Sequence, residues 1–526
     1  MTDRIQSYLC GAWQSGDAAG SNLVNPTTEE IIATADTSGL DFGAALAFAR
    51  NEGGRSLRNM TFVERASLLQ NMSSALHGAR EILIDSAILN GGCTRGDAKF
   101  DIDGAIGTLA AYAEFGREMG DQKILADGEG IQLGRSPRFW GQHIYTPKHG
   151  VAVFINAFNF PAWGFAEKAA CAILGGMPVL TKPATSTAHT AWKMTEVLVD
   201  VADMPAGTLS FVGGRPGDLL DHLISQDVLA FTGSADTARG LRQHPRVIAH
   251  TVPVKVEADS LNATVLGADV EAGSEAMSLF AKDICRDMTQ KTGQKCTATR
   301  RIFVPEDSAE AATEALIEQL SEIKIGNPTL REARMGPLAS QRQLQDVQAG
   351  VERLLSESEI VFGQVGRPSE LVGIDNDKGF FHPILLLRSK DGAQATQVHE
   401  HEVFGPVATI IPYSGKAEDA VALVAKGDGG LVSSVFSDDR KFLQEMTLGL
   451  APYHGRIYLG GEKVAEYATG PGLVLPSCVH GGPGRAGAGE ELGGIRGVKH
   501  FMQRTAVQGY RPLVEKITGT KKPANS

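Results

Sequence analysis

The chain has 526 residues, of which 42% are hydrophobic and 21% are charged, and its net charge is -11. This length exceeds one typical domain, so we expect two or three compact lobes, each with its own core. The dispersed negative charge argues against nucleic acid or an anionic membrane surface as a partner. Because the sequence shows neither a signal peptide nor a run of 18 apolar residues, we expect a cytoplasmic protein without membrane contact.

From residue 151 onward, short β-rich runs alternate with longer helical stretches, a pattern typical of βα units and a largely parallel sheet. The predicted strands span residues 151–156, 179–182, 209–212, 228–232 and 252–257. A second alternating region over 264–436, with strands at 301–304 and 383–387, predicts another α/β lobe. Ligands bind at the carboxyl ends of parallel strands, so we expect the functional residues just after these runs.

Asn159 follows the first predicted strand, in Asn156-Ala157-Phe158-Asn159-Phe160-Pro161. Its side-chain amide is a donor that can stabilise negative charge on a reacting oxygen, together with a backbone N–H. The alternative is an asparagine that holds a turn.

Lys182 ends the second predicted strand, which suits an ammonium group that binds the ribose hydroxyls or a phosphate of a cofactor. The alternative is a surface lysine before a turn. Thr185 follows three residues later and offers a hydroxyl instead of a carboxylate that would repel a 2'-phosphate, so the sequence permits NADP.

The fourth predicted strand runs into Phe231-Thr232-Gly233-Ser234, whereas no Gly-x-Gly-x-x-Gly follows the first strand. Ser234 can cap a helix whose free amides would face a pyrophosphate. This pattern is not specific by itself.

Cys296 lies in Gly293-Gln294-Lys295-Cys296-Thr297, a predicted loop between the helical stretch 281–288 and the strand at 301. Four basic residues near it in sequence should favour the thiolate and its attack on a carbonyl carbon; they are Lys291, Lys295, Arg300 and Arg301. The alternative is an inert buried thiol, which we expect for the other five cysteines.

Glu257 ends the fifth predicted strand and is the candidate base that activates water to hydrolyse a thioester on Cys296. Partial desolvation at a strand end should raise its pKa. The alternative is a solvated or ion-paired carboxylate.

His399, His401 and Glu402 could suggest a metal site around Glu400. We expect none, because alternate residues of an extended segment point to opposite faces and no third ligand motif accompanies them.

Taken together, these features resemble the aldehyde dehydrogenase superfamily in their order along the chain. The matching residues are Asn159, Lys182, Phe231-Thr232-Gly233-Ser234, Glu257, Gly293-Gln294-Lys295-Cys296 and Glu402-Val403-Phe404-Gly405-Pro406-Val407. The resemblance extends from about residue 25 to residue 508.

The resemblance implies an α/β aldehyde dehydrogenase fold with three parts, and homodimers or dimers of dimers. The parts are a Rossmann-like cofactor-binding domain (1–124 and 146–257), an α/β catalytic domain (258–479) and a small oligomerisation element (125–145 and 480–526). It also implies a small aldehyde substrate and site roles for individual residues. These are Cys296 as nucleophile, Glu257 as general base, Asn159 as oxyanion donor, Lys168 on a proton-exit path, and Lys182, Thr185, Phe231, Gly233, Ser234, Glu402 and Phe404 as cofactor contacts.

Three departures from the family pattern point to one of its branches. Asp259 and Ser260 stand where many members have glycines after the base, Glu257 and Cys296 are further apart than usual, and Thr185 replaces a glutamate common in NAD-preferring members. The first two predict altered packing and an insertion; the third favours NADP, with NAD as the alternative.

These departures and the Gly-rich segment 480–487 resemble the semialdehyde dehydrogenases of aerobic, CoA-linked aromatic degradation. Two kinds of relative compete there: one half of the bifunctional phenylacetate ring-opening protein, and a free-standing enzyme of benzoyl-CoA oxidation. We favour the second, and so a CoA-linked semialdehyde, because the chain ends without a hydratase domain. A CoA-acylating dehydrogenase and a non-catalytic protein of the same fold remain alternative hypotheses.

Overall fold

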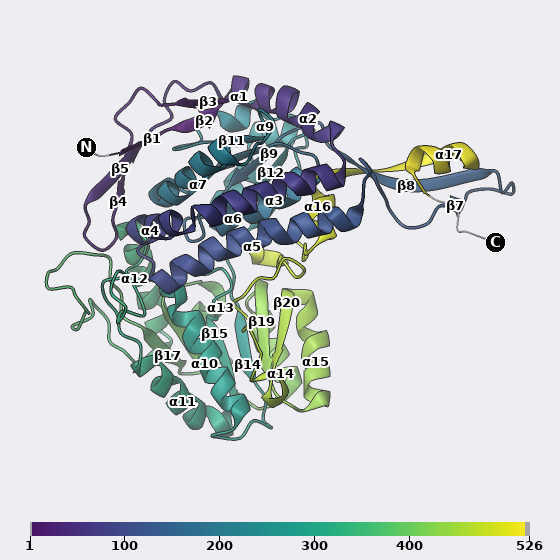
Figure 1. Cartoon of the computed structure of the whole chain (residues 1–526). Helices are drawn as coiled ribbons and strands as arrows, with labels where there is room; N and C mark the ends of the chain where they lie inside the picture. Colours follow the sequence, from purple (N-terminus) through teal and green to yellow (C-terminus); the bar gives the residue numbers. More distant parts are fainter. Residues whose placement is uncertain (1–2, 521–526) are drawn as a thin grey trace.

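Two seven-stranded sheets organise the chain, one in each of two lobes, and a four-stranded sheet forms an arm that projects from the upper lobe (Figure 1). The computed structural model describes residues 3–520. The arrangement confirms the α/β fold that the sequence predicts.

The first sheet contains all five predicted strands in a parallel array, in the order β13-β12-β9-β10-β11, and continues into the antiparallel edge strands β2 and β3. Its strands are β2 (Ser7–Leu9), β3 (Ala12–Gln14), β9 (Ala152–Ile155), β10 (Val179–Lys182), β11 (Leu209–Phe211), β12 (Val228–Thr232) and β13 (Val254–Glu257). A smaller sheet of β1 (Asp3–Ile5), β5 (Ile31–Ala35) and β4 (Ser21–Val24) lies in the same lobe.

Helices cover both faces of this sheet, because successive strand side chains point to opposite sides. Ala152 and Phe154 pack into one hydrophobic core, and Val151 and Val153 pack into the other. The first core receives α2 (Gly54–Asn59), α3 (Phe62–Gly78), α4 (Arg80–Gly91), α5 (Arg95–Met119), α6 (Trp163–Leu174) and α7 (Ala188–Val201). The second receives α1 (Phe42–Phe48) and α9 (Pro245–Ala249), while α8 (Ala235–Arg242) packs on a small cluster near β13.

The second lobe has the strand order β16-β17-β18-β15-β14-β19-β20, parallel throughout except for β16. Its strands are β14 (Ala263–Leu266), β15 (Arg301–Pro305), β16 (Ser358–Phe362), β17 (Leu385–Ser389), β18 (Val407–Tyr413), β19 (Gly430–Phe436) and β20 (His454–Gly460). One face packs on α10 (Glu275–Thr289) and α11 (Ala309–Ser321). The other packs on α12 (Gln341–Leu355), α14 (Ala417–Ala425) and α15 (Arg440–Leu450).

The arm is built from segments far apart in sequence. β8 (Phe139–Pro147) pairs antiparallel with β21 (Met502–Tyr510) along its full length, and β6 (Leu125–Ala126) and β7 (Ile131–Gln132) also pair with β8. α16 (Ile495–His500) precedes β21, and α17 (Arg511–Thr518) follows it at the far end of the arm (Figure 1). No helix within residues 3–520 is long and apolar enough to cross a membrane.

Candidate active site

Four polar residues lie at one edge of the first sheet, where its parallel strands end. Asn156 follows β9, Lys182 ends β10, Thr232 ends β12 and Glu257 ends β13. All four line cavities that Cys296, from the second lobe, also lines. The carboxyl ends of these strands therefore bring polar side chains together beside Cys296.

The loop that carries Cys296 is held by an unusual backbone turn. Lys291, Thr292 and Gly293 have φ angles of 53°, 57° and 67°, a left-handed conformation that costs free energy in non-glycine residues. The turn leads the chain from α10 directly into the thiol segment.

Buried side chains then fix the carbonyl groups of this segment. Asn262 Nδ2 donates to the carbonyl oxygen of Cys296 at 2.7 Å. The Arg300 guanidinium donates to the carbonyls of Gly293 and Lys295 at 3.0 and 3.1 Å. The main chain around the thiol is thus anchored on both sides, which limits the freedom of its side chain.

Cys296 lies where two cavities meet. A cavity of about 550 Å³ is lined by Lys168 and by apolar side chains. The apolar side chains come from Phe100, Phe160, Trp163 and Val474. A larger cavity of about 1600 Å³ extends along the carboxyl ends of the first sheet. Asn159, Thr232, Glu257 and Cys296 line both, so a ligand in either cavity can reach the thiol.

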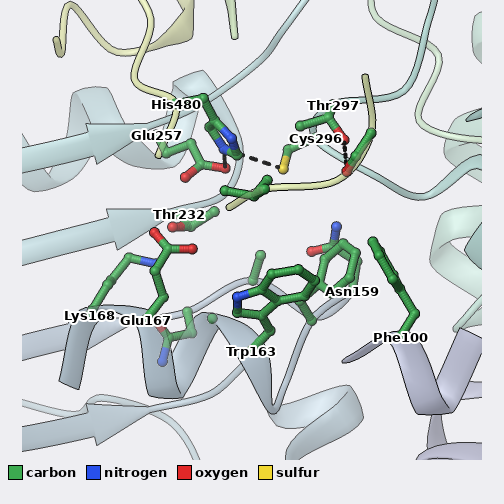
Figure 2. A pocket seen from close by; sticks show the side chains of 16 residues that line it. Phe100, Asn159, Trp163, Glu167, Lys168, Thr232, Glu257, Cys296, Thr297 and His480 are labelled. Carbon is green, nitrogen blue, oxygen red and sulfur yellow. Dashed lines mark hydrogen bonds and ion pairs between the residues drawn. The ribbon is translucent and has the colours of Figure 1, made fainter. Parts of the chain in front are cut away.

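The thiol contacts a carboxylate and an imidazole. His480 Nε2 lies 3.3 Å from Glu257 Oε1 and 3.8 Å from Cys296 Sγ, and one ligand-type atom of each of the three lies within 4.8 Å of the others. Figure 2 shows Glu257 and His480 on one side of the sulfur and Asn159 on another. His480 was not predicted from the sequence, where it appeared only as part of a Gly-rich segment. A single histidine in such a segment is not a specific signal for a functional residue.

Two electrostatic expectations are wrong. Burial opposes ionisation of Glu257, but the His480 imidazole and the Lys168 ammonium lower the pKa of Glu257 to about 2. Burial and the Glu257 carboxylate hold the pKa of the Cys296 thiol well above its ordinary value. The carboxylate is therefore ionised and the thiol protonated near neutral pH.

The basic residues near Cys296 in sequence do not surround its sulfur, because each is engaged elsewhere. Lys291 pairs with Asp101 at 3.4 Å and Lys295 with Asp287 at 2.7 Å. Arg300 pairs with Glu402 at 3.4 Å. The fourth, Arg301, is buried and donates to the Leu261 carbonyl at 2.7 Å.

Asn159 is 7% exposed, and its Nδ2 donates to the Gln294 carbonyl at 2.8 Å. A primary amide carries two donor hydrogens. The first bond fixes the amide, and the second hydrogen is available to an oxygen atom in the cavity beside Cys296.

Most of the expected cofactor residues line the larger cavity. They are Lys182, Phe231, Gly233, Ser234, Glu402 and Phe404; Thr185 does not line it, although its neighbour Ala184 does. Burial lowers the pKa of Lys182 to about 8, and burial raises that of Glu402 to about 7 against the opposing Arg300. Ser234 caps α8, accepting from Thr237 N at 3.4 Å, as the sequence predicts.

The larger cavity fits a nicotinamide dinucleotide by the chemistry of its walls. Thr232 Oγ1 and Asn156 Oδ1 are buried, and neither has a hydrogen-bond partner among residues 3–520. The start of α8 and the Lys182 ammonium suit phosphate and ribose groups.

The residues that stand in place of the glycines expected after Glu257 make hydrogen bonds of their own. Asp259 Oδ1 accepts from Ala235 N, the first amide of α8, at 3.0 Å. Ser260 N donates to Glu402 Oε2 at 3.0 Å. The Asp259 carboxylate therefore lies at the helix end that we expect to bind the cofactor phosphates.

His399 lies in α13 (Gln397–Glu400), not in the extended segment we expected. Its Nδ1 lies 3.0 Å from Arg301 Nη1, and its ring stacks on Phe303. Glu402 instead accepts hydrogen bonds from Ser260 and Arg300. His399 and Glu402 therefore have different hydrogen-bond partners.

The model of the aldehyde dehydrogenase family matches residues 13–507. The 3,4-dehydroadipyl-CoA semialdehyde dehydrogenase of Aromatoleum evansii is 44% identical over 483 residues, which cover 91% of this chain and 93% of that protein. The expected resemblance to the family and to a free-standing semialdehyde dehydrogenase is confirmed.

Solved structures agree in fold. A 3,6-anhydro-L-galactose dehydrogenase in complex with NAP superposes with a TM-score of 0.83 at 20% identity, covering 96% of this chain and 100% of the other. A betaine aldehyde dehydrogenase from Staphylococcus aureus in complex with NAD+ gives 0.83 at 21% identity, covering 99% and 96%.

Proposed function

Because the chain belongs to the aldehyde dehydrogenase family, we propose that it oxidises a CoA-linked semialdehyde to the carboxylic acid, with Cys296 as nucleophile. The observation that carries this proposal is the meeting of a thiol, an amide and a carboxylate where an apolar cavity joins a dinucleotide-sized one. The name of the Aromatoleum evansii relative supports a 3,4-dehydroadipyl-CoA semialdehyde or a similar substrate.

The first step forms the bond between sulfur and substrate carbon. Glu257 accepts the Cys296 proton, the thiolate attacks the aldehyde carbon, and the C=O π electrons move onto oxygen. The free Nδ2 hydrogen of Asn159 and the Cys296 backbone N–H stabilise this oxyanion. Lys168, which lines the same cavity, lies on the path by which Glu257 releases its proton.

A nicotinamide bound in the larger cavity supplies the hydride acceptor that turns the thiohemiacetal into a thioester. Glu257 then takes a proton from water, whose oxygen attacks the thioester carbon. The C–S bond breaks, and the acid and the Cys296 sulfur are released. Because the pKa of Glu257 lies well below its ordinary value, the carboxylate is ionised near neutral pH and has free lone pairs for the proton in both steps.

We propose NADP as the preferred cofactor and NAD as the alternative. Thr185 carries no negative charge to repel a 2'-phosphate. It lies three residues after Lys182 in the chain, next to Ala184 at the cavity wall.

We also propose a homodimer, or a dimer of dimers, that assembles through the arm. The arm presents apolar side chains that are exposed to solvent and that no other element within residues 3–520 covers. The most exposed are Ile131, Phe139, Tyr510, Leu513 and Ile517.

Steady-state assays of the full chain test the proposal. They compare NADP with NAD, and a six-carbon CoA semialdehyde with simple aldehydes of increasing length, and mass analysis of the product separates free acid from acyl-CoA. We expect acid, NADP preference and the highest kcat/KM for the CoA substrate. Cys296→Ala should abolish turnover, and Glu257→Gln should strongly lower kcat, because both the activation of the thiol and the hydrolysis of the thioester use the Glu257 carboxylate.

Three results would argue against individual parts. Formation of acyl-CoA only with added coenzyme A would favour the CoA-acylating alternative. Equal kcat/KM for both cofactors would remove the NADP preference. Unchanged oxidation by Cys296→Ala would end the proposed chemistry and revive the non-catalytic alternative.

A further inference from the structure

We propose that His480 is a positioning residue for Glu257: its Nε2–H holds the carboxylate beside Cys296, in the place from which that carboxylate takes protons. The inference rests on the proposed function of Glu257 and adds a residue outside the expected set. His480 is separated from Glu257 and Cys296 by long stretches of chain, so only the fold brings the three together.

The hydrogen bonds of the ring define its role. His480 is 4% exposed, and its Nε2 faces both Glu257 Oε1 and Cys296 Sγ. Its Nδ1 is buried and has no hydrogen-bond partner among the described residues 3–520. The network therefore assigns a proton to Nε2, where an acceptor lies.

This assignment makes the ring a donor rather than the base. To accept the thiol proton at Nε2, the ring would have to carry its own proton at Nδ1. That N–H would be buried without an acceptor, whereas an N–H at Nε2 already faces the Glu257 carboxylate. Glu257 needs no such rearrangement, because an ionised carboxylate has lone pairs for both the imidazole and the thiol.

Close backbone packing fixes the position of the imidazole. The Leu492 amide donates to the carbonyl of Val479, the residue before His480, at 2.9 Å. A Cβ on Gly481, the residue after it, would lie 2.0 Å from the Glu490 carbonyl oxygen, closer than any real contact. The main chain on both sides of His480 is thus packed too tightly to let the ring drift.

Charged groups from several elements face this cluster. Glu167 and Lys168 of α6 line the same cavity. The Glu402 carboxylate raises the pKa of the Cys296 thiol, and charge on Cys296 raises the pKa of Arg456. Of these, only Lys168 joins His480 in lowering the pKa of Glu257. Burial raises the pKa of Glu257, and the imidazole is one of the groups that offset this effect. The pKa of Glu257 would therefore rise without the imidazole.

Two amide variants that differ mainly in reach test the proposal. In His480→Gln the side-chain Nε2 can occupy the place of the histidine Nε2, whereas in His480→Asn the amide nitrogen ends one bond short. We expect the Gln variant to keep kcat within about threefold of wild type. We expect the Asn variant to lose about tenfold or more in kcat at pH 7, with KM for NADP unchanged, since general-base catalysis depends on carboxylate position.

Two further readouts separate positioning from simple structural support. The acid limb of the kcat profile of the Asn variant should move up by at least about one pH unit, because its base loses a donor. Its thioester should accumulate during turnover and be visible in the intact mass. Thermal unfolding of both variants serves as the folding control, and His480→Leu replaces His480→Asn if the latter does not fold.

Each alternative outcome would overturn the proposal. Equal loss in well-folded Gln and Asn variants would mean that the imidazole itself carries the proton. Wild-type kcat and pH profiles in both, or in His480→Leu, would mean that the ring only fills space. Failure of the proposed function is a distinct result, because it would appear in the wild-type chain and in Cys296→Ala.

Discussion

The surroundings of Cys296 oppose its ionisation, although sequence alone pointed the other way. Burial and the Glu257 carboxylate hold the pKa of the thiol well above its ordinary value. The sulfur becomes nucleophilic only when its proton moves to a neighbouring group, which links its reactivity to Glu257 and His480.

A pH series on the cofactor-free protein tests this link. Below its pKa a thiol gains about tenfold in thiolate fraction per pH unit. We expect the alkylation rate of Cys296 by iodoacetamide to rise in this way from pH 7 to pH 9, without a plateau. Peptide mass analysis distinguishes Cys296 from exposed Cys478, and Cys296→Ser is the control; a plateau below pH 8 would contradict the raised pKa.

The Asp259 carboxylate lies at the start of α8, where we propose that the cofactor phosphates bind. Asp259→Asn keeps an oxygen acceptor for Ala235 N but removes the charge. We expect KM for NADP to fall by about threefold to tenfold with kcat unchanged, because a like charge near the phosphates is gone. Steady-state kinetics check this, with the exposed Asp121→Asn as control; a higher KM would show that the charge itself holds the loop for binding.

The sequence allowed some of these residues to be predicted but not others. Asn159, Glu257 and Cys296 lie directly after a strand or in a loop beside one, so chain position and chemistry pointed to them. The partners of Lys295 and Arg300 could not be read in this way, because a side chain pairs with whatever the fold brings near it. His480 was missed for the same reason.

At the scale of elements, the left-handed turn before Cys296 is a tightly constrained piece of backbone near the site. A Cβ on Gly293 would lie 2.3 Å from the Gly405 carbonyl oxygen, and its φ of 67° favours glycine. The turn and the segment at Gly405 are therefore packed backbone to backbone. This contact fixes the position of the loop that carries Cys296.

Gly293→Ala should displace the thiol loop. We expect a loss of about 1–3 kcal/mol in the free energy of unfolding, from strain and the backbone clash, and a fall in kcat of about tenfold or more from misplacement of the sulfur. Urea unfolding and steady-state kinetics measure the two effects. Gly107→Ala, at a helical position of α5 with open space around the added Cβ, should be neutral or stabilising; equal behaviour of the two variants would refute the packing argument.

Elements with a strong hydrophobic period were predictable, and pairings between distant segments were not. The parallel strands β9 to β13 appear close to their expected positions because their apolar runs end in turn residues. The antiparallel addition of β2 and β3 to β11 depends on where the N-terminal segment returns in space. The pairing of β8 with β21 likewise joins two segments that only the family resemblance assigned to one element, and no local pattern in the sequence indicates their pairing.

At the scale of the whole molecule, the two lobes each contribute residues to the proposed active site. The first sheet supplies Asn159 and Glu257, and the second lobe supplies Cys296 and Glu402, so neither lobe has a complete site. The segment from Val479 to Gly487 belongs to neither regular sheet. It packs against β13, where a Cβ on Gly487 would meet the Val256 carbonyl oxygen at 2.1 Å. This packing places His480 beside Glu257 and Cys296.

The arm carries exposed apolar side chains that, in the dimer we propose, a second copy of the chain covers. Leu513 and Ile517, on α17, are 54% and 57% exposed. Burying such side chains against a second copy contributes about 25 cal/mol per Å² of apolar area. We therefore expect Leu513→Asp combined with Ile517→Asp to convert a dimer into monomers, as measured by light scattering after size-exclusion chromatography.

A matched control lies on α15 of the other lobe, where Leu448 is 69% exposed. Leu448→Asp should leave the oligomer intact, because a singly exposed leucine on a monomer surface is ordinary. Retention of the dimer by the double variant, or its loss in Leu448→Asp, would move the interface away from the arm. Since His480 and Cys296 lie in the lobes and not on α17, the monomer should retain its thiol reactivity toward iodoacetamide even where turnover falls.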